Sequence, residues 1–291
     1  MARGLAAVVP GDGLTIVANV GDDETVYGLD LCPDLDTVLY TLAGREGPQG
    51  WGVADDTRTV LGHLATLGVD TTFRVGDADL ATNLLRTAAL RSGSPLSPVI
   101  ARLAAAFGLT CSLLPASDDP VRTVVETTTG ERLAFQEYFV RRGHRDEIGA
   151  VSFEGAEQAT PAPGVLDAIA AAEMVVIAPS NPVLSIWPIL AVPGIRDAVA
   201  TARRVVAVSP LFGGKALKGP ADRVLASLGL PGGTAGLLAA YDGLLHDLVV
   251  DRDDEADVAR FEGRVRLHAA DTRIADPGAA ARFASWLLDL P

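Results

Sequence analysis

The sequence predicts an α/β protein with a Rossmann-like, doubly wound and mostly parallel sheet that carries a smaller inserted α+β subdomain. Three observations support this prediction. Short apolar, β-branched runs such as residues 14–18, 174–178 and 204–208 alternate with helical segments. Each run stops at a polar or Gly-containing loop, as strands of a buried parallel sheet do. Between residues 111 and 155 the runs become short and alternating, which indicates antiparallel hairpins.

Composition limits the size of the core and the classes of partner that the protein can bind. A chain of 291 residues that is 48% hydrophobic can bury a large core. Its formal net charge of -13 argues against nucleic acid and anionic membranes as partners, because phosphate surfaces need a basic face. Two cysteines, Cys32 and Cys111, give neither a metal-ligand spacing nor a disulfide framework. We therefore expect a cytoplasmic protein with reduced cysteines and no membrane span.

The first helix is expected near residues 1–9, and the first strand over residues 14–18. That strand runs into a polar loop with Asn19, Asp22 and Asp23. Ligands bind at the carboxyl ends of strands in open α/β sheets, so this loop is a candidate site wall. A second acidic group, Asp34 and Asp36, follows at the predicted start of a helix behind Pro33.

These carboxylates have two explanations. Helix capping and Asx turns account for Asp and Asn at loop edges in most proteins. If both loops face one crevice, however, the same oxygens can hold a hard divalent cation or deprotonate an alcohol.

Helices are expected over residues 60–67, 77–90 and 94–109, with Arg74 at a strand end before the second of them. Arg74 can face an anionic group. We expect residues 1–110 and 156–291 to form the Rossmann-like core, and residues 111–155 to form the inserted β-rich subdomain.

In the second half, two predicted strands end in loops rich in Ser and Gly. Residues 174–178 lead to Ser180 and Asn181, and residues 204–208 lead to Gly213, Gly214 and Lys218. Such loops can bind phosphate oxygens through N–H groups and hydroxyls, with lysine charge beside them. Their spacing is not that of a Walker loop, and Pro-Gly punctuation alone also predicts turns here.

Seven stretches together resemble the 2-phospho-L-lactate transferases of coenzyme F-420 biosynthesis and their actinobacterial phosphoenolpyruvate-using relatives. In order, they are NVGDD at 19–23, CPDLDTVLY at 32–40, VGDADLA at 75–81, LPASDDP at 114–120, FQEY at 135–138, APSNP at 178–182 and GKALKGPA at 214–221. They span nearly the whole chain in the order of the family.

The resemblance implies a transfer of a phospholactyl-type group from a guanosine diphosphate conjugate to the ribityl hydroxyl of the deazaflavin Fo. GMP is released, and magnesium is required. It implies Mg²⁺ ligands among Asp22, Asp23 and Asp36, and catalytic roles for Asp36 and Asp34, with Asp36 on the attacking hydroxyl. It also implies a homodimer.

For substrate binding, the resemblance implies one set of residues: Asn19, Asp36, Arg74, Ser180, Asn181, Gly213, Gly214 and Lys218. Arg74 would lie near the deazaflavin, and Ser180, Asn181 and the glycine loop on the nucleotide side. The donor, whether a phospholactate, phosphoenolpyruvate or phosphoglycerate conjugate, stays open.

One departure from the family is the absence of its opening strand and Gly-rich turn, because Met1 aligns just after them. A start assigned too late and a natural loss both explain this. The alternative function is therefore a nucleotide- or deazaflavin-binding protein without turnover. A second alternative is another α/β sugar- or nucleotide-processing enzyme that shares only the architecture.

Overall fold

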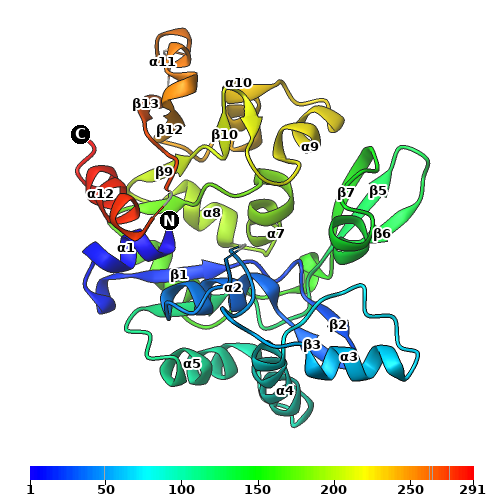
Figure 1. Ribbon diagram of the computed structural model, residues 1–291. Helices are drawn as coiled ribbons and strands as arrows, with labels where there is room; N and C mark the ends of the chain where they lie inside the picture. The colour runs from blue at the N-terminus through cyan, green and yellow to red at the C-terminus, as the bar shows by residue number, and fades with distance from the viewer. Residues whose placement is uncertain (49, 262, 264, 275) are drawn as a thin grey trace.

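The computed structural model describes residues 1–48, 50–261, 263, 265–274 and 276–291, and its elements alternate as an α/β protein requires (Figure 1). The strands are β1 (Thr15–Ala18), β2 (Glu24–Val26), β3 (Leu29–Leu31), β4 (Ser112–Pro115), β5 (Arg122–Thr127), β6 (Arg132–Ala134), β7 (Ile148–Glu154), β8 (Val175–Ile177), β9 (Val205–Val208), β10 (Leu211–Phe212), β11 (Lys215–Ala216), β12 (Asp247–Asp251) and β13 (Arg266–Ala270). The helices are α1 (Ala2–Val8), α2 (Pro33–Leu42), α3 (Thr59–Thr66), α4 (Asp77–Arg91), α5 (Leu96–Ala106), α6 (Val165–Ala171), α7 (Trp187–Leu190), α8 (Ile195–Ala200), α9 (Ala221–Ser227), α10 (Gly233–Ala240), α11 (Ala256–Arg260) and α12 (Pro277–Leu288).

Two parallel sheets form the centre. Four strands pair in the order β13-β12-β9-β8, all parallel, and β1 pairs with β4 in parallel. Every residue of β9 and β12 is buried, which explains their continuous apolar sequences. Strand β1 is less buried than its sequence suggests, because Thr15 is exposed. The α/β prediction with a mostly parallel sheet is confirmed.

Helices cover these sheets. Helices α2 and α5 pack against the β1–β4 pair, and α1 packs against α12 beside the four-stranded sheet (Figure 1). Among the described residues, no helix is long and apolar enough to cross a membrane.

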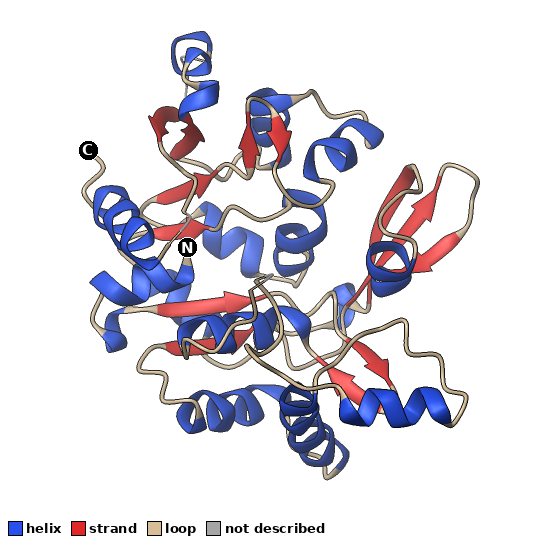
Figure 2. Cartoon of the chain, viewed as in Figure 1, coloured by secondary structure: helices blue, strands red, loops and turns tan. Residues whose placement is uncertain are grey.

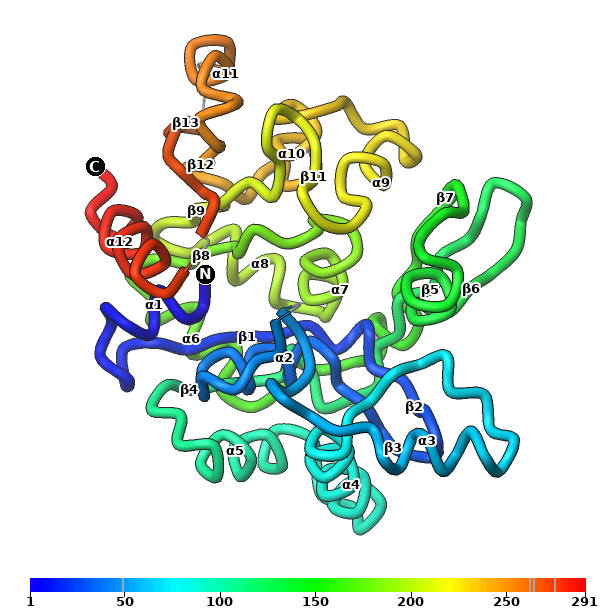
Figure 3. The backbone as a smooth tube through the Cα atoms, viewed as in Figure 1, coloured from blue at the N-terminus to red at the C-terminus, as the bar shows by residue number. Residues whose placement is uncertain are grey.

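The antiparallel sheet β6-β5-β7 projects from the right-hand edge of the molecule (Figure 3). It confirms the antiparallel pattern expected after residue 120. The first of the expected hairpin runs was wrongly placed, however, because Ser112–Pro115 is β4 and pairs with β1 in the core. The division into a core and an insert over residues 111–155 remains our proposal.

Two small hairpins, β2–β3 and β10–β11, lie beside the parallel sheets (Figure 2). The strand end expected before Arg74 is wrong: residues 70–76 contain no strand, and α4 begins directly at Asp77. This segment is held by a side chain instead: the Tyr27 hydroxyl donates to the Phe73 carbonyl at 2.6 Å.

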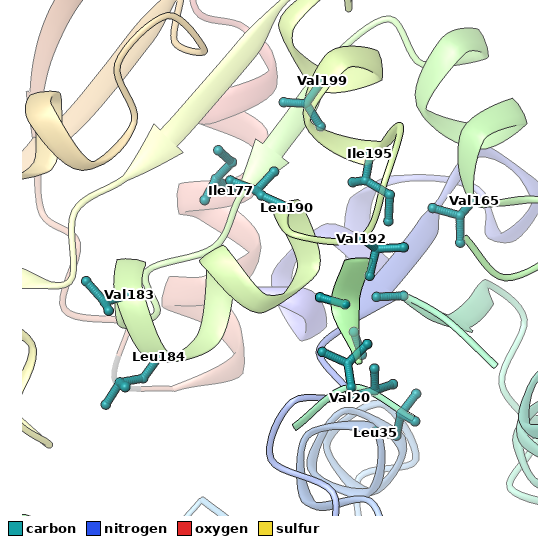
Figure 4. Packing of buried hydrophobic residues seen from close by; sticks show 14 of the residues in the cluster. Val20, Leu35, Val165, Ile177, Val183, Leu184, Leu190, Val192, Ile195 and Val199 are labelled. Atoms are coloured by element: carbon teal, nitrogen blue, oxygen red, sulfur yellow. The ribbon is translucent and has the colours of Figure 1, made fainter. Parts of the chain in front are cut away.

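The main core runs beneath the first polar loop. Val20 and Leu35 are 2% and 0% exposed and belong to the same apolar cluster as Val192 and Ile195 (Figure 4). Each polar loop therefore alternates acidic residues with apolar anchors. Burial of the anchors fixes the backbone from which the carboxylates project.

Candidate active site

The loop after β1 and the start of α2 meet through one side chain. Asn19 Nδ2 donates to Asp22 Oδ1 and to Asp34 Oδ2, each at 3.0 Å, and Asn19 Oδ1 accepts from the Gly21 N–H at 2.7 Å. The prediction that the two acidic loops face each other is confirmed. The capping and Asx-turn explanation holds in part, because Asn19 makes an Asx turn with Gly21 and the Asp36 carboxylate accepts from the Cys32 N–H at the start of α2.

Close packing sets the shape of the loop at Gly21. A Cβ atom there would lie 2.5 Å from Thr123 Oγ1 and 2.8 Å from Pro188 Cβ. From β6, the chain continues to Gln136, whose Nε2 donates to the Asp22 carbonyl at 2.8 Å. The antiparallel sheet and α7 therefore both hold the acidic loop in place.

Asp36 has a different partner. Its carboxylate forms an ion pair with Arg86 of α4, which is 0% exposed. Arg86 also donates to Asn83 Oδ1 at 2.6 Å, and Asn83 Nδ2 donates to the Asp79 carbonyl at 2.9 Å. The Tyr40 hydroxyl donates to Asp79 Oδ1 at 2.8 Å, which completes a buried network behind Asp36.

Burial raises the pKa of every carboxylate in this cluster. It raises the pKa of Asp23 to about 7, against the opposing effect of the Cys32 thiol and of Arg122 and Arg86. It raises the pKa of Asp36 to about 6, although Arg86 stabilises the ionised form. Burial and then the Asp34 charge raise the pKa of Asp22, and burial raises that of Asp34.

The chemistry of the cluster fits a cation at one place. Among the described residues, Asp22 and Asp34 share an amide and have no Arg or Lys ion pair, whereas Asp36 has Arg86. No group of three or more His, Cys, Asp or Glu side chains within the described ranges is arranged to hold a metal. Two carboxylates suffice for Mg²⁺, which keeps several waters and takes further ligands from substrate phosphates.

Two cavities adjoin the acidic loop. One of about 450 Å³ lies between residues 21–25 and the sheet β6-β5-β7, and the other, of about 270 Å³, lies between the loop and residues 117–120. Asp23, Glu24 and Arg122 line both. Asp22 lines the larger cavity only, and Asn19, Asp34 and Asp36 lie behind these walls.

The residues predicted for the nucleotide side lie away from both cavities. Asn181 Oδ1 accepts from the N–H groups of Val183 and Leu184 at 3.0 and 3.1 Å and so caps the turn before α7. Its Nδ2 is buried with no hydrogen-bond partner within the described part of the chain. Ser180 precedes it and is partly exposed, and Arg74 is exposed beside α4.

Gly213 and Gly214 form the tight turn of the β10–β11 hairpin. Their φ angles of 59° and 75° are those of a two-residue turn with both central residues left-handed, which favours glycine. Their N–H groups stabilise the Asp254 carboxylate, whose pKa is nevertheless raised by burial. Lys218 follows on an exposed stretch. The structure thus accounts for the two glycines as a turn, and it does not bring them to the acidic cluster.

Sequence reasoning missed Arg86, Thr123 and Gln136. For Arg86 a signal existed, because Asp79, Asn83 and Arg86 repeat at helical spacing and the buried residues of α4 are polar: Thr82, Asn83, Arg86 and Thr87. Thr123 and Gln136 carry no such pattern. They reach the loop only because β5 and β6 fold back over it.

Comparison with known proteins shows the family of this chain. A family model described as 2-phospho-L-lactate transferase CofD matches residues 1–282. A phosphoenolpyruvate transferase of Streptomyces griseus is 45% identical over 296 residues, which covers 99% of this chain and 93% of that protein. One of Thermobifida fusca is 43% identical over 285 residues, covering 95% of this chain and 87% of that protein.

A solved structure shows the same fold. The crystal structure of a UPF0052 family protein from Bacillus halodurans matches with a TM-score of 0.65 and 17% identity, covering 99% of this chain and 94% of that one. The family model spans almost the whole chain, and both transferases are more than 40% identical to it over nearly its full length. The chain belongs to the CofD family of 2-phospho-L-lactate transferases.

Proposed function

We propose that this protein transfers a phosphoenolpyruvyl- or phospholactyl-type group from a guanosine diphosphate conjugate to the terminal ribityl hydroxyl of the deazaflavin Fo. GMP is released, and the product enters coenzyme F-420 biosynthesis. The observation that carries the proposal is the contact of two acidic loops through Asn19, in a chain of this family. Relatives named phosphoenolpyruvate transferase favour the phosphoenolpyruvyl donor.

The reaction needs one proton acceptor. A bond forms between the acceptor oxygen and the phosphorus that carries the transferred group, and the bond from that phosphorus to the GMP oxygen breaks. The hydroxyl proton passes to a carboxylate. We assign this role to Asp36, since Arg86 favours its ionised form and fixes its position. To Asp34, two residues before Asp36 on α2, we assign the orientation of the same hydroxyl.

Mg²⁺ fits the Asp22 and Asp34 carboxylates. Bound there, it would neutralise the diphosphate and stabilise the leaving group. Of the predicted metal ligands, Asp22 is retained. Asp34 takes the place of Asp36 as the second ligand, because Asp36 already forms an ion pair with Arg86. Asp23, also predicted as a ligand, has a less direct claim because Arg122 and Arg86 lie near it.

The nucleotide side is assigned to the loops after β8 and β9. Asn181 Nδ2, buried without a partner among the described residues, is a donor for a guanylate oxygen. Ser180, Gly213, Gly214 and Lys218 complete the proposed site, with Arg74 near the deazaflavin and Asn19 holding the carboxylates. We further propose a cytoplasmic homodimer.

The test is incubation with Fo, Mg²⁺ and each guanylated donor, with GMP release and product mass as readouts. A new acidic deazaflavin product supports transfer, whereas Fo or GDP binding without product supports a binding protein without turnover. Failure to bind either would favour an unrelated α/β enzyme.

Asp36→Asn should lower kcat by about 10²- to 10⁴-fold, because it removes the proton acceptor but keeps an oxygen for Arg86. The matched control is Asp12→Asn, an exposed acid near the opposite end of β1, and it should keep full turnover. Full turnover by Asp36→Asn would remove this residue from the mechanism.

A further inference from the structure

The FQEY stretch at residues 135–138 begins at the end of β6 and leads into a π-helical turn, η2 (Glu137–Arg141). None of its residues is assigned to the substrates, the cation or the proton transfer. Turns of the π type are rare in proteins and occur frequently at functional sites. The contacts that this stretch makes with the acidic loop indicate what it does.

Three successive carbonyl groups of the acidic loop, those of residues 20–22, accept hydrogen bonds from the antiparallel sheet and the turn that follows it. In the same order, the donors are Arg122 Nη1 at 3.5 Å, the Thr123 N–H at 2.8 Å and Gln136 Nε2 at 2.8 Å. Because each contact joins the loop to a distant part of the chain, the path of the loop backbone is set from outside the parallel sheets.

Of the three donors, Gln136 is the side chain dedicated to the loop. Thr123 donates through its backbone, and its buried hydroxyl lines the larger cavity with no partner among the described residues. The Arg122 donor makes a shorter bond, of 2.7 Å, to the Val121 carbonyl. Gln136 is 5% exposed, and its amide reaches the Asp22 carbonyl. A substitution of Gln136 therefore removes this contact and leaves the backbone pairing of the sheet intact.

The carbonyl that Gln136 holds belongs to a residue of the proposed cation pair. The Asp22 carboxylate and the Asp34 carboxylate both accept from the Asn19 amide. In Asp22 the carbonyl and the side chain branch from the same Cα atom, so a rotation of the carbonyl also turns the carboxylate. Mg²⁺ demands near-ideal octahedral geometry, and a displaced ligand weakens its binding.

The backbone that carries Gln136 is itself fixed. The rings of Phe135 and Phe139 stack across the turn with centroids 5.2 Å apart. Beyond the turn, Arg223 of α9 donates to His144 Nδ1 at 2.7 Å and so joins this segment to the core. The Gln136 amide therefore extends from a packed support, as a group that fixes the position of another must.

We propose that Gln136 is a positioning residue for the reaction, which acts through Asp22 by holding its carbonyl so that the carboxylate projects toward Asp34. The proposal rests on the proposed function and adds a residue that tunes the cation pair. It gives the antiparallel sheet and its π-helical turn a part in the chemistry, since they set the geometry of the acidic loop.

The test compares two substitutions that each remove a hydrogen bond from a side chain to a backbone carbonyl. Gln136→Met keeps the length of the side chain and removes its donor to Asp22. Tyr27→Phe, the control, removes the donor to the Phe73 carbonyl, outside the cation pair. The Kd for Mg²⁺ is measured by thermal shift without substrates, the free energy of unfolding by urea in EDTA, and kcat and KM with Fo and a guanylated donor.

We expect both variants to be less stable than the wild type and only one to bind Mg²⁺ more weakly. Gln136→Met raises the Kd for Mg²⁺ about five- to tenfold, the effect of one hydrogen bond, and lowers kcat with an unchanged KM for Fo. Tyr27→Phe keeps the wild-type Kd and kcat. Gln136→Asn, whose amide is drawn back by one carbon, raises the Kd as Gln136→Met does and serves if the methionine variant does not fold.

A wild-type Kd for Mg²⁺ in Gln136→Met and Gln136→Asn, with only stability lost, shows that Gln136 supports the fold alone and overturns the inference. A wild type without affinity for Mg²⁺ overturns it too. The Mg²⁺ titration contains no substrate, so its result is separate from turnover. If the wild type binds Mg²⁺ but forms no product from Fo, the proposed function fails, and a raised Kd in Gln136→Met still supports the hold of Gln136 on the cation pair.

Discussion

The acidic cluster has two halves that differ in one respect. Asp36 and Asp79 lie around Arg86, a buried cation that the fold supplies. Asp22 and Asp34 are held by the amide of Asn19, and neither is paired with a basic side chain of the described residues. Residue type and burial are alike in the two halves. The fold therefore supplies a counterion to one half, whereas in the other half the two carboxylates share an amide.

The largest expected effect is in the half with Arg86. Arg86→Met should lower the free energy of unfolding by about 3–5 kcal/mol, because it leaves a buried carboxylate without its partner. Urea unfolding measures this change. Arg132→Met is the control, since its ion pair with Glu154 is 58% and 57% exposed and should cost at most about 1 kcal/mol. Equal costs for the two variants would contradict a special role for Arg86.

The next effect is a pH dependence of stability. Burial raises the pKa of Asp23 from 3.8 to about 7, so between these values the folded chain binds more protons than the unfolded chain. Its contribution is most favourable below pH 4 and is lost as the pH rises through 7. The free energy of unfolding should fall by up to about 1.4 kcal/mol per pH unit in this window.

Urea unfolding from pH 4.5 to 8 in EDTA measures this slope. Asp23→Asn should reduce it, because the variant has no carboxylate at this position. A slope that Asp23→Asn leaves unchanged would show that the buried carboxylate is not its source.

A packing effect of intermediate size tests the half with Asn19. Gly21→Ala should destabilise the protein by about 1–3 kcal/mol, because the new Cβ would lie 2.5 Å from Thr123 Oγ1 and 2.8 Å from Pro188 Cβ. Gly62→Ala is the control within helix α3, where a Cβ has nothing within 4 Å, and it should stabilise by about 0.5–1 kcal/mol. The free energy of unfolding is measured for both variants by thermal unfolding. If both substitutions stabilised the protein, Gly21 would not be tightly packed.

The smallest effect separates the two halves by metal binding. Mg²⁺ at ten times its Kd should stabilise the wild type by about 1.4 kcal/mol. Asp22→Asn and Asp34→Asn should abolish this gain, and Asp36→Asn should keep it, since Asp36 faces Arg86. Thermal shift with and without Mg²⁺ measures it. Loss of the gain in Asp36→Asn alone would restore Asp36 as the ligand.

The meeting of the acidic loops was predictable, because a buried strand and a Pro-started helix place their polar ends at one edge of a sheet. The ion pair of Asp36 was not, since Arg86 lies 50 positions along the chain. The same limit applies to the glycines. Gly213 and Gly214 fit a phosphate loop or a hairpin turn equally well as sequence, and only the pairing of β10 with β11 decides for the turn.

The sequence alone determined the alternation of strands and helices, the acidic loop after β1 and the family to which its motifs point. These features depend on local periodicity and on residues close together in the chain. Only the tertiary structure decided which carboxylate has a counterion and which buried oxygens face a cavity. Arg86 reaches Asp36 from another helix, and Thr123 reaches Gly21 from another sheet, so both contacts depend on packing between distant segments.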